Sequence, residues 1–243
     1  MGDADLRELE RRFRETGSVE DEAAWLRARV QAGELEASML ELAAYCRHSG
    51  AGGLDDRHQD LWELEGLPGG RKRVWGEGLA TWGEEACVRA MICVLRANLS
   101  DWEGLTPEDI DDTPEILAHY GWASRDMKLP GEALSGLELL VVSRSSSVRQ
   151  RLLDLRARSQ ELWLTCLGSD ITPAGNTSQA VEFALQVVGG KLSNTGAGVA
   201  CGLEGTVEFA QSVVAHELVP WALGYSDPVL ERVKSRHRGP AGE

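Results

Sequence analysis

The stretch at residues 82–102 places the strongest constraint on the fold of this chain. Between residues 86 and 97 only Arg89 and Arg96 are polar. They lie seven positions apart, so on a helix they share one narrow polar stripe and leave the rest of the surface apolar. A helix of this kind has to be covered by other elements. The apolar run is too short for a bilayer, which requires about 20 residues. The stretch therefore predicts the buried central helix of a soluble helical domain.

The remainder of the chain shows the helical period between glycine, proline and capping signals. Helices are predicted at residues 3–15, 19–32 and 34–48, with Ser18 as the N-cap of the second and Gly33 as its end. No useful stretch alternates with the period of a strand. We predict an all-α fold, a single multi-helix bundle or array of about nine to eleven helices around the central one. A three-helix unit at residues 1–48 is expected to pack on a main domain at 54–243 as one integrated domain.

Further helices are predicted at residues 54–66, 114–127, 132–143, 148–167, 177–188, 196–215 and 229–236. Loops are predicted at residues 67–73, 129–131 and 169–176. In the helix at 196–215, Gly198, Gly202 and Gly205 would each cost about 1 kcal/mol relative to alanine. Glycines retained at that cost usually let two backbones approach closely, so a tight helix crossing is expected there. Pro220 is expected to kink or end the helix that it follows.

Charge and cysteine content narrow the class of protein. The formal net charge is −14, which makes nucleic acid an unlikely partner because its phosphates repel such a surface. The charged start of the chain predicts no secretory signal. The five cysteines form no CxxC pair and lie within apolar helical patterns. Reduced, buried thiols in a cytoplasmic protein that does not enter a membrane are therefore expected.

No motif for catalysis, cofactor binding or metal binding is complete. The glycines at residues 196–202 resemble a dinucleotide fingerprint but follow no strand, and residues 189–191 are only a fragment of a phosphate loop. His216 and Glu217 begin a zinc-protease motif that lacks its second histidine. Cys46 and His48 have no partner pair nearby for a metal. We therefore predict no catalytic, cofactor or metal residues, which favours a protein that is not an enzyme.

Several residues are candidates for an interaction surface or a pocket. The basic run of Arg71 to Arg73 is a possible contact patch, and tryptophan is a frequent anchor at protein interfaces. A cleft built from His119, His216 and Glu217 would instead indicate a ligand-binding protein or an enzyme. A nucleic-acid binder would combine the basic run with Arg149 and Arg151. The full set of interaction or pocket candidates is Arg71, Lys72, Arg73, His119, Trp122, His216, Glu217 and Trp221.

Three blocks of the sequence together resemble a known group of proteins. They lie at residues 19–48, at 82–90 (W-G-E-E-A-C-V-R-A) and at 218–233 (L-V-P-W-A-L-G-Y-S-D-P-V-L-E-R-V). They resemble an uncharacterised all-helical protein family of high-GC bacteria and, loosely, the helical immunity proteins of polymorphic-toxin systems. The resemblance implies one integrated domain and brings no catalytic motif. We therefore expect a protein that acts by binding another protein, in an immunity-like or regulatory role.

Overall fold

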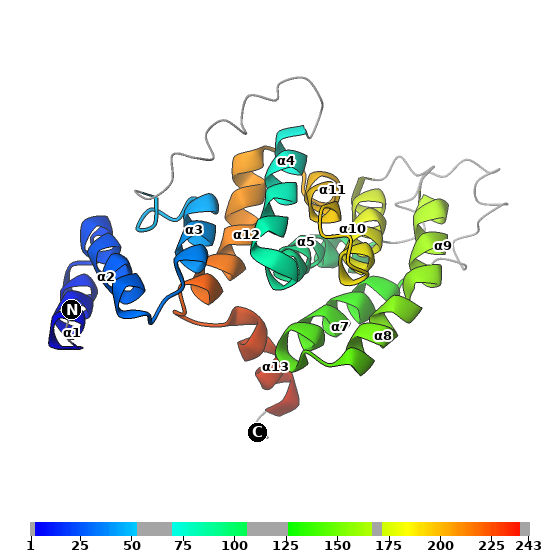
Figure 1. Ribbon diagram of the computed structural model, residues 1–243. Helices are drawn as coiled ribbons and strands as arrows, with labels where there is room; N and C mark the ends of the chain where they lie inside the picture. Colours follow the sequence, from blue (N-terminus) through cyan, green and yellow to red (C-terminus); the bar gives the residue numbers. More distant parts are fainter. Residues whose placement is uncertain (1–2, 53–69, 106–125, 167–171, 239–243) are drawn as a thin grey trace.

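Helix α5, Gly83–Glu103, runs through the middle of the protein (Figure 1). The computed structural model describes residues 3–52, 70–105, 126–166 and 172–238, and every regular element in these ranges is a helix. Residues 86–95 of α5 are all buried. Four helices pack against α5: α7 (Leu129–Ser143), α10 (Thr172–Val188), α11 (Asn194–Gly202) and α12 (Val207–Ala222). The predicted all-α array around a buried central helix is confirmed.

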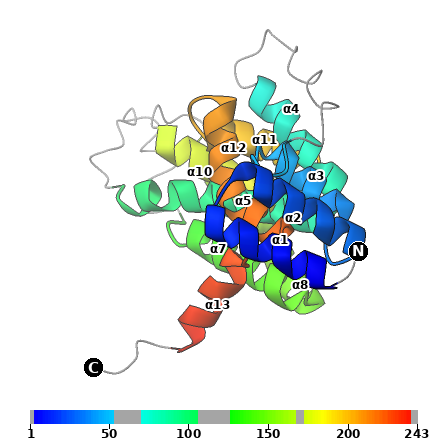
Figure 2. The same cartoon turned by 90° about the vertical axis from the view of Figure 1, so that its left-hand side faces the viewer.

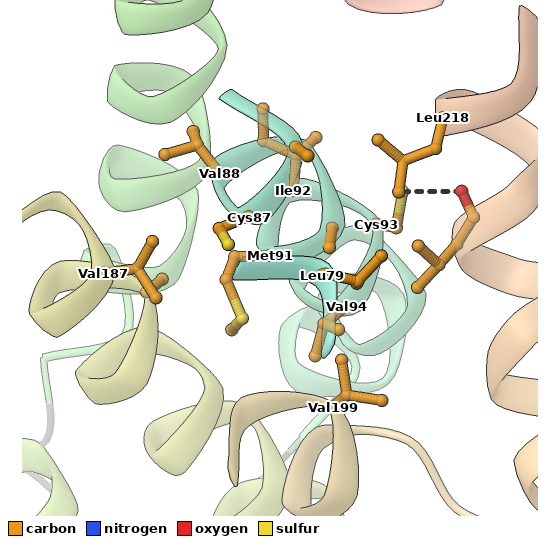
Figure 3. Packing of buried hydrophobic residues seen from close by; sticks show 14 of the residues in the cluster. Leu79, Cys87, Val88, Met91, Ile92, Cys93, Val94, Val187, Val199 and Leu218 are labelled. Carbon is orange, nitrogen blue, oxygen red and sulfur yellow. Dashed lines mark hydrogen bonds between the residues drawn. The ribbon is translucent and has the colours of Figure 1, made fainter. Parts of the chain in front are cut away.

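The side chains of α5 meet a different neighbour on each side (Figure 3). Met91 and Val94 lie toward α11, where Gly198 and Gly202 leave room for them. Cys93 lies toward α12 and donates its S–H to the carbonyl oxygen of Val214 at 3.8 Å. Burial raises the pKa of the Cys93 thiol well above its ordinary value. All five cysteines are free thiols, and Cys201 alone of them is not fully buried, as the sequence pattern predicted.

Arg89 corrects the prediction of a solvated stripe on the central helix. Its side chain is only 1% exposed. The guanidinium donates hydrogen bonds of 2.9 and 2.8 Å to the two carboxylate oxygens of Asp227 and bonds of 3.1 and 3.3 Å to Glu85. It also lies 4.4 Å from the centre of the Trp221 ring. Arg89 therefore joins α5 to the residue before α13, Pro228–Arg238, and only Arg96 of the stripe reaches solvent.

The expected tight crossing is present, and it joins α11 to α4, Gly70–Gly78. A Cβ atom added to Gly76 would lie 2.8 Å from the Cα atom of Gly196. A Cβ atom on Gly196 would collide with the carbonyl oxygen of Arg73, and one on Gly202 would collide with Val94. Two backbones and the α5 side chains therefore occupy the space that a methyl group would need. The glycines are required by packing between helices.

The single helix predicted at residues 196–215 is wrong. Helix α11 ends at Gly202, and α12 begins at Val207 after Gly205 adopts a φ of +82°. The Thr206 hydroxyl accepts a hydrogen bond from the Phe209 N–H at 3.3 Å and caps the new helix. The glycine and the cap together form a turn. Helix α12 then continues through Pro220 to Ala222, so the proline lies inside its last turn.

Proline marks two helix starts that were predicted as loops. Helix α7 begins at Leu129 with Pro130 in its first turn, where a missing N–H breaks no helical hydrogen bond. Helix α10 begins at Thr172 and has Pro173 in the corresponding place. The residues predicted as a turn at 129–131, and most of the loop predicted at 169–176, are therefore helical. The basic run at residues 71–73 is also helical, because α4 begins at Gly70.

The predicted helix at residues 148–167 is divided in two. Helix α8, Ser146–Asp154, and α9, Arg156–Cys166, are separate elements that meet at Leu155. The helix predicted at 54–66 and nearly all of the one at 114–127 lie outside the described residues. No helix within the described ranges combines the length and the apolarity needed to cross a membrane.

The N-terminal helices follow the predicted caps closely. They are α1, Asp3–Thr16, α2, Val19–Ala32, and α3, Ala37–Tyr45. The Ser18 hydroxyl accepts a hydrogen bond from the Asp21 N–H at 3.1 Å, and Gly33 ends α2 with a φ of +74°. Helix α3 is shorter than predicted, since residues 34–36 precede it. Helix α1 packs on α2, whereas α3 packs on α12.

Candidate functional site

A groove of about 840 Å³ follows α12 between the end of α3 and the start of α13. One face of α12 forms its base, with side chains recurring every three or four residues from Glu208 through Ser212 and Ala215 to Val219. The opposite walls come from residues 46–49 and from Tyr225 to Glu231. We call this hollow the α12 groove. Its lining mixes apolar, hydroxyl and charged side chains, as in surfaces that bind other molecules.

A hydrogen-bonded triplet stands at one end of the α12 groove. The Glu22 carboxylate lies 3.0 Å from Nε2 of His48 and accepts a hydrogen bond from the Tyr225 hydroxyl at 2.6 Å. Burial, followed by the hydrogen bond to Glu22, raises the pKa of Tyr225 above its usual value. The His48 and Tyr225 rings meet edge to face, with centroids 6.5 Å apart. The triplet fixes the orientation of His48, and it ties α2 to the residues after α3 and α12.

Aromatic stacking extends this contact into α1. The Trp25 ring lies between Phe13 and Tyr225, with centroids 5.4 and 5.7 Å away. The Arg29 guanidinium lies 5.0 Å from the centre of Trp25 and donates to the Leu223 carbonyl oxygen at 2.6 Å. A second hollow of about 670 Å³ lies beside this stack, and Tyr225 lines both hollows. The stack therefore clamps the α1–α2 hairpin to the turn between α12 and α13.

Gln211 is a polar side chain without a partner in the lining of the α12 groove. It is 1% exposed, and within the described part of the chain neither its amide oxygen nor its amide nitrogen has a hydrogen-bond partner. Buried amides are normally paired, and an unpaired one costs stability. Gln211 is therefore the residue of the groove whose bonding needs are unmet in the free protein.

The structure separates His216 from Glu217. His216 is exposed and lines the α12 groove. Glu217 is 5% exposed and accepts a hydrogen bond from Arg232 at 2.7 Å. The two side chains therefore do not form the cleft that the sequence suggested, and its third candidate, His119, lies outside the described residues. So does Trp122. Trp221 packs beneath the Arg89 guanidinium and is only partly exposed.

The basic candidates are held in contacts within the protein. The Lys72 ammonium donates to the Leu203 carbonyl oxygen, and Arg73 pairs with Glu77 at 2.9 Å. Partial burial lowers the pKa of Lys72. Arg149 pairs with Glu84 at 2.8 Å. Helix α4, which carries Arg71, Lys72 and Arg73, lies far from α8 in both views (Figures 1 and 2). The two sets therefore do not join into one basic patch for nucleic acid.

A buried ionic cluster holds the C-terminal helix. Glu138 of α7 is completely buried and pairs with Arg96 at 3.0 Å, with Arg232 at 2.9 Å and with Arg236. Arg232 also bridges to Glu217 of α12. Helix α13 otherwise projects away from the body of the protein (Figure 2). Its docking therefore depends on the negative charge of one buried carboxylate.

Glu138→Gln is expected to lower the free energy of unfolding by about 2 kcal/mol, because hydrogen bonds to charged groups are worth roughly 1.5–3 kcal/mol. The substitution leaves three arginines facing a neutral amide, so α13 should separate from α7 more often. Hydrogen exchange measured by mass spectrometry would show faster exchange in residues 228–238. The matched control is Glu132→Gln on the same helix, where an exposed pair with Arg158 contributes at most about 1 kcal/mol. Equal exchange in both variants would contradict the role of Glu138.

Sequence reasoning missed the residues that define the groove, although one signal was available. Along α12 the inward positions are mostly apolar, and Gln211 and Glu217 interrupt them. Polar residues on the buried face of a helix require partners, so both positions could have been singled out. Glu22 and Tyr225 carry no such signal, because an acidic residue is ordinary in the first turn of a helix.

Comparison with known proteins adds no relative. No protein-family model matches the chain, and neither a curated protein nor a solved structure matches it.

Proposed function

We propose that this protein acts by binding another protein, and that the α12 groove holds a segment of that partner. The observation that carries the proposal is the groove itself, in which one whole face of α12 has no helix packed against it among the described residues. Two large apolar side chains lie close to it. Phe209 in the first turn of α12 is 51% exposed, and Tyr225 just after α12 is 39% exposed. Exposed aromatic side chains beside a groove are typical of protein-binding surfaces.

The charge of the chain supports a basic partner. A net charge of −14 attracts positively charged proteins over distances near the Debye length and speeds their association. Glu208 and Glu231 bring two carboxylates to the lining of the α12 groove. An immunity-like or regulatory role in the cytoplasm, in which the protein captures a basic partner, follows from this charge and from the sequence resemblance.

A ligand-binding or enzymatic role in the same groove is the second candidate. The observation in its favour is the Glu22–His48 pair, because a carboxylate that orients a histidine is a common acid–base arrangement. The nearest thiol gives it little support. Burial raises the pKa of Cys46 to about 12, so this cysteine stays protonated and a poor nucleophile at neutral pH.

The proposed function is tested by filling the groove. Ser212 is an exposed residue of the groove whose hydroxyl donates a hydrogen bond to the Phe209 carbonyl oxygen at 2.8 Å. Ser212→Trp places a large ring in the groove and leaves the buried core untouched. Ser235 offers a matched control, because it is exposed on α13 and makes the same bond, at 2.8 Å, to the Arg232 carbonyl oxygen.

The experiment compares proteins recovered with the wild type, Ser212→Trp and Ser235→Trp from the source cells, using quantitative mass spectrometry. We expect a basic protein in the wild-type and Ser235→Trp samples and at least a tenfold loss with Ser212→Trp. The recovered protein should also dissociate as salt is added, because its attraction is electrostatic. A partner retained equally by Ser212→Trp would overturn the assignment of the groove. If no partner depends on the groove while small metabolites do, the second candidate replaces the first.

A further inference from the structure

The buried amide of Gln211 indicates what the occupant of the α12 groove offers. A carboxamide presents one acceptor oxygen beside an NH₂ group with two donors. Both atoms of Gln211 lack partners within the described residues, although the residue lines the groove. Glutamine has three side-chain torsions, so a change of rotamer turns the amide toward the groove without moving α12. The missing partners can therefore come from whatever fills the groove.

We propose that this occupant is an extended peptide segment, one of whose main-chain peptide groups pairs with Gln211 through both its N–H and its C=O. The proposal rests on the proposed function and names the chemistry by which the partner is held. A peptide group places a donor and an acceptor side by side, which is the complement of a carboxamide. In an extended segment these groups are free, whereas in a helix they are already bonded.

Other small chemistries fit the groove less well. A carboxylate or a phosphate offers only acceptors, so it would leave the oxygen of Gln211 unpaired. It would also face the carboxylates of Glu208 and Glu231. Arg47 is the one arginine in the described lining, and it interacts electrostatically with Glu208. An anion is therefore disfavoured by the same residues that accept a peptide group.

The length and side chains of the segment follow from α12. Glu208 and Val219 are eleven residues apart, which corresponds to about 16 Å along a helix. An extended chain advances about 3.3 Å per residue, so about five residues span this distance. A basic side chain is expected near Glu208, one turn before Gln211. An apolar side chain is expected near Ala215 and Val219.

The pairing is tested with the smallest peptide-group analogue. N-methylacetamide carries both the N–H and the C=O, whereas N,N-dimethylacetamide lacks the N–H and is the matched control. Each is titrated into the full-length protein, and the side-chain NH₂ signals are followed by ¹H–¹⁵N NMR. We expect N-methylacetamide to shift the Gln211 signals at least fivefold more than the control does. Gln150, which is exposed and already bonded to Asp154 at 2.8 Å, serves as the internal reference.

A variant separates this pairing from a purely structural oddity. Gln211→Met keeps the length of the side chain and removes an unpaired amide, so the free protein should unfold at the same or a higher temperature. The shifts of neighbouring groove residues with N-methylacetamide should disappear in this folded variant. Three results would each overturn the pairing: equal shifts with both analogues, no shift at Gln211 in the wild type, or neighbouring groove residues that still shift in the variant.

The two proposals fail in different ways. If Ser212→Trp loses the partner but N-methylacetamide leaves Gln211 unmoved, the groove binds a protein by other contacts and the pairing is wrong. If N-methylacetamide engages Gln211 but Ser212→Trp keeps its partner, the peptide-group site is real and the proposed function of the groove is wrong.

Discussion

Gly196→Ala is expected to lower the free energy of unfolding by about 3 kcal/mol, the upper part of the range for overpacked cores. The new methyl group would meet the Arg73 carbonyl oxygen and, at 2.9 Å, the backbone nitrogen of Glu77. Both atoms belong to the backbone of α4, so they cannot move aside as a flexible side chain would. The helices α4 and α11 would have to separate. Urea denaturation followed by circular dichroism measures the change.

The matched control is Gly131→Ala. Gly131 lies in the first turn of α7, and a Cβ atom there would meet nothing within 4 Å. This substitution is expected to leave stability unchanged or raise it by up to about 1 kcal/mol, because alanine restricts the unfolded chain. A loss in Gly131→Ala as large as in Gly196→Ala would show that helical glycines act here through local conformation and not through the crossing.

Arg89→Met is expected to cost about 4 kcal/mol, since breaking a buried ion pair leaves one charge without a counterion. The lost bonds reach Asp227 and Glu85, and the stacking on Trp221 is lost with them. Asp227 would remain 27% exposed in its side chain and without its cation. The double variant Arg89→Met with Asp227→Asn should recover part of the loss, which a thermodynamic cycle measures. No recovery would mean that Arg89 acts mainly through packing.

The same pair predicts a pH dependence. Burial acts to raise the pKa of Asp227, but the hydrogen bonds from Arg89 and from the Leu230 N–H outweigh it and hold the pKa below its usual value. A lowered pKa in the folded state contributes stability above the unfolded value of about 3.9, and this contribution is lost as the pH falls. The difference in stability between wild type and Arg89→Met should therefore narrow from pH 7 toward pH 3. A constant difference would exclude Asp227 as the titrating partner.

The central helix was predictable because its evidence is local. The apolar run of α5 places nearly every side chain of residues 86–95 inward, and any array of helices would have to cover it. The role of Arg89 was not predictable, because Asp227 lies 138 residues further along the chain. From the helix alone, an arginine with no visible partner reads as solvated. Its burial depends on a contact that only the tertiary fold creates.

Helix ends show the same division between local and distant causes. Ser18 and Gly33 were predicted as caps because each acts on the backbone beside it. The end of α11 was missed because the sequence treats Gly205 as one more glycine of a packing stripe. In the structure Gly202 packs against α5, whereas Gly205 turns the chain with a positive φ. The two roles look alike in a sequence and differ only in what surrounds each residue.

The candidate site was predictable only in part. His216 was chosen and does line the α12 groove, but its chosen companion Glu217 belongs to the buried cluster around Arg232. Adjacent residues of a helix point about 100° apart, so a single site seldom contains both. The contacts of Glu22 with His48 and Tyr225 span 26 and 203 residues, beyond the reach of any pattern in the sequence.

The position of Tyr225 has a thermodynamic consequence. Because the same ring borders both hollows, a molecule that displaces it from one side alters the volume open on the other. Occupation of the two hollows is therefore coupled, and linkage requires the coupling to be reciprocal: each ligand changes the affinity for the other by the same factor. The clamp formed by Phe13, Trp25 and Tyr225 would be the element through which this heterotropic effect passes.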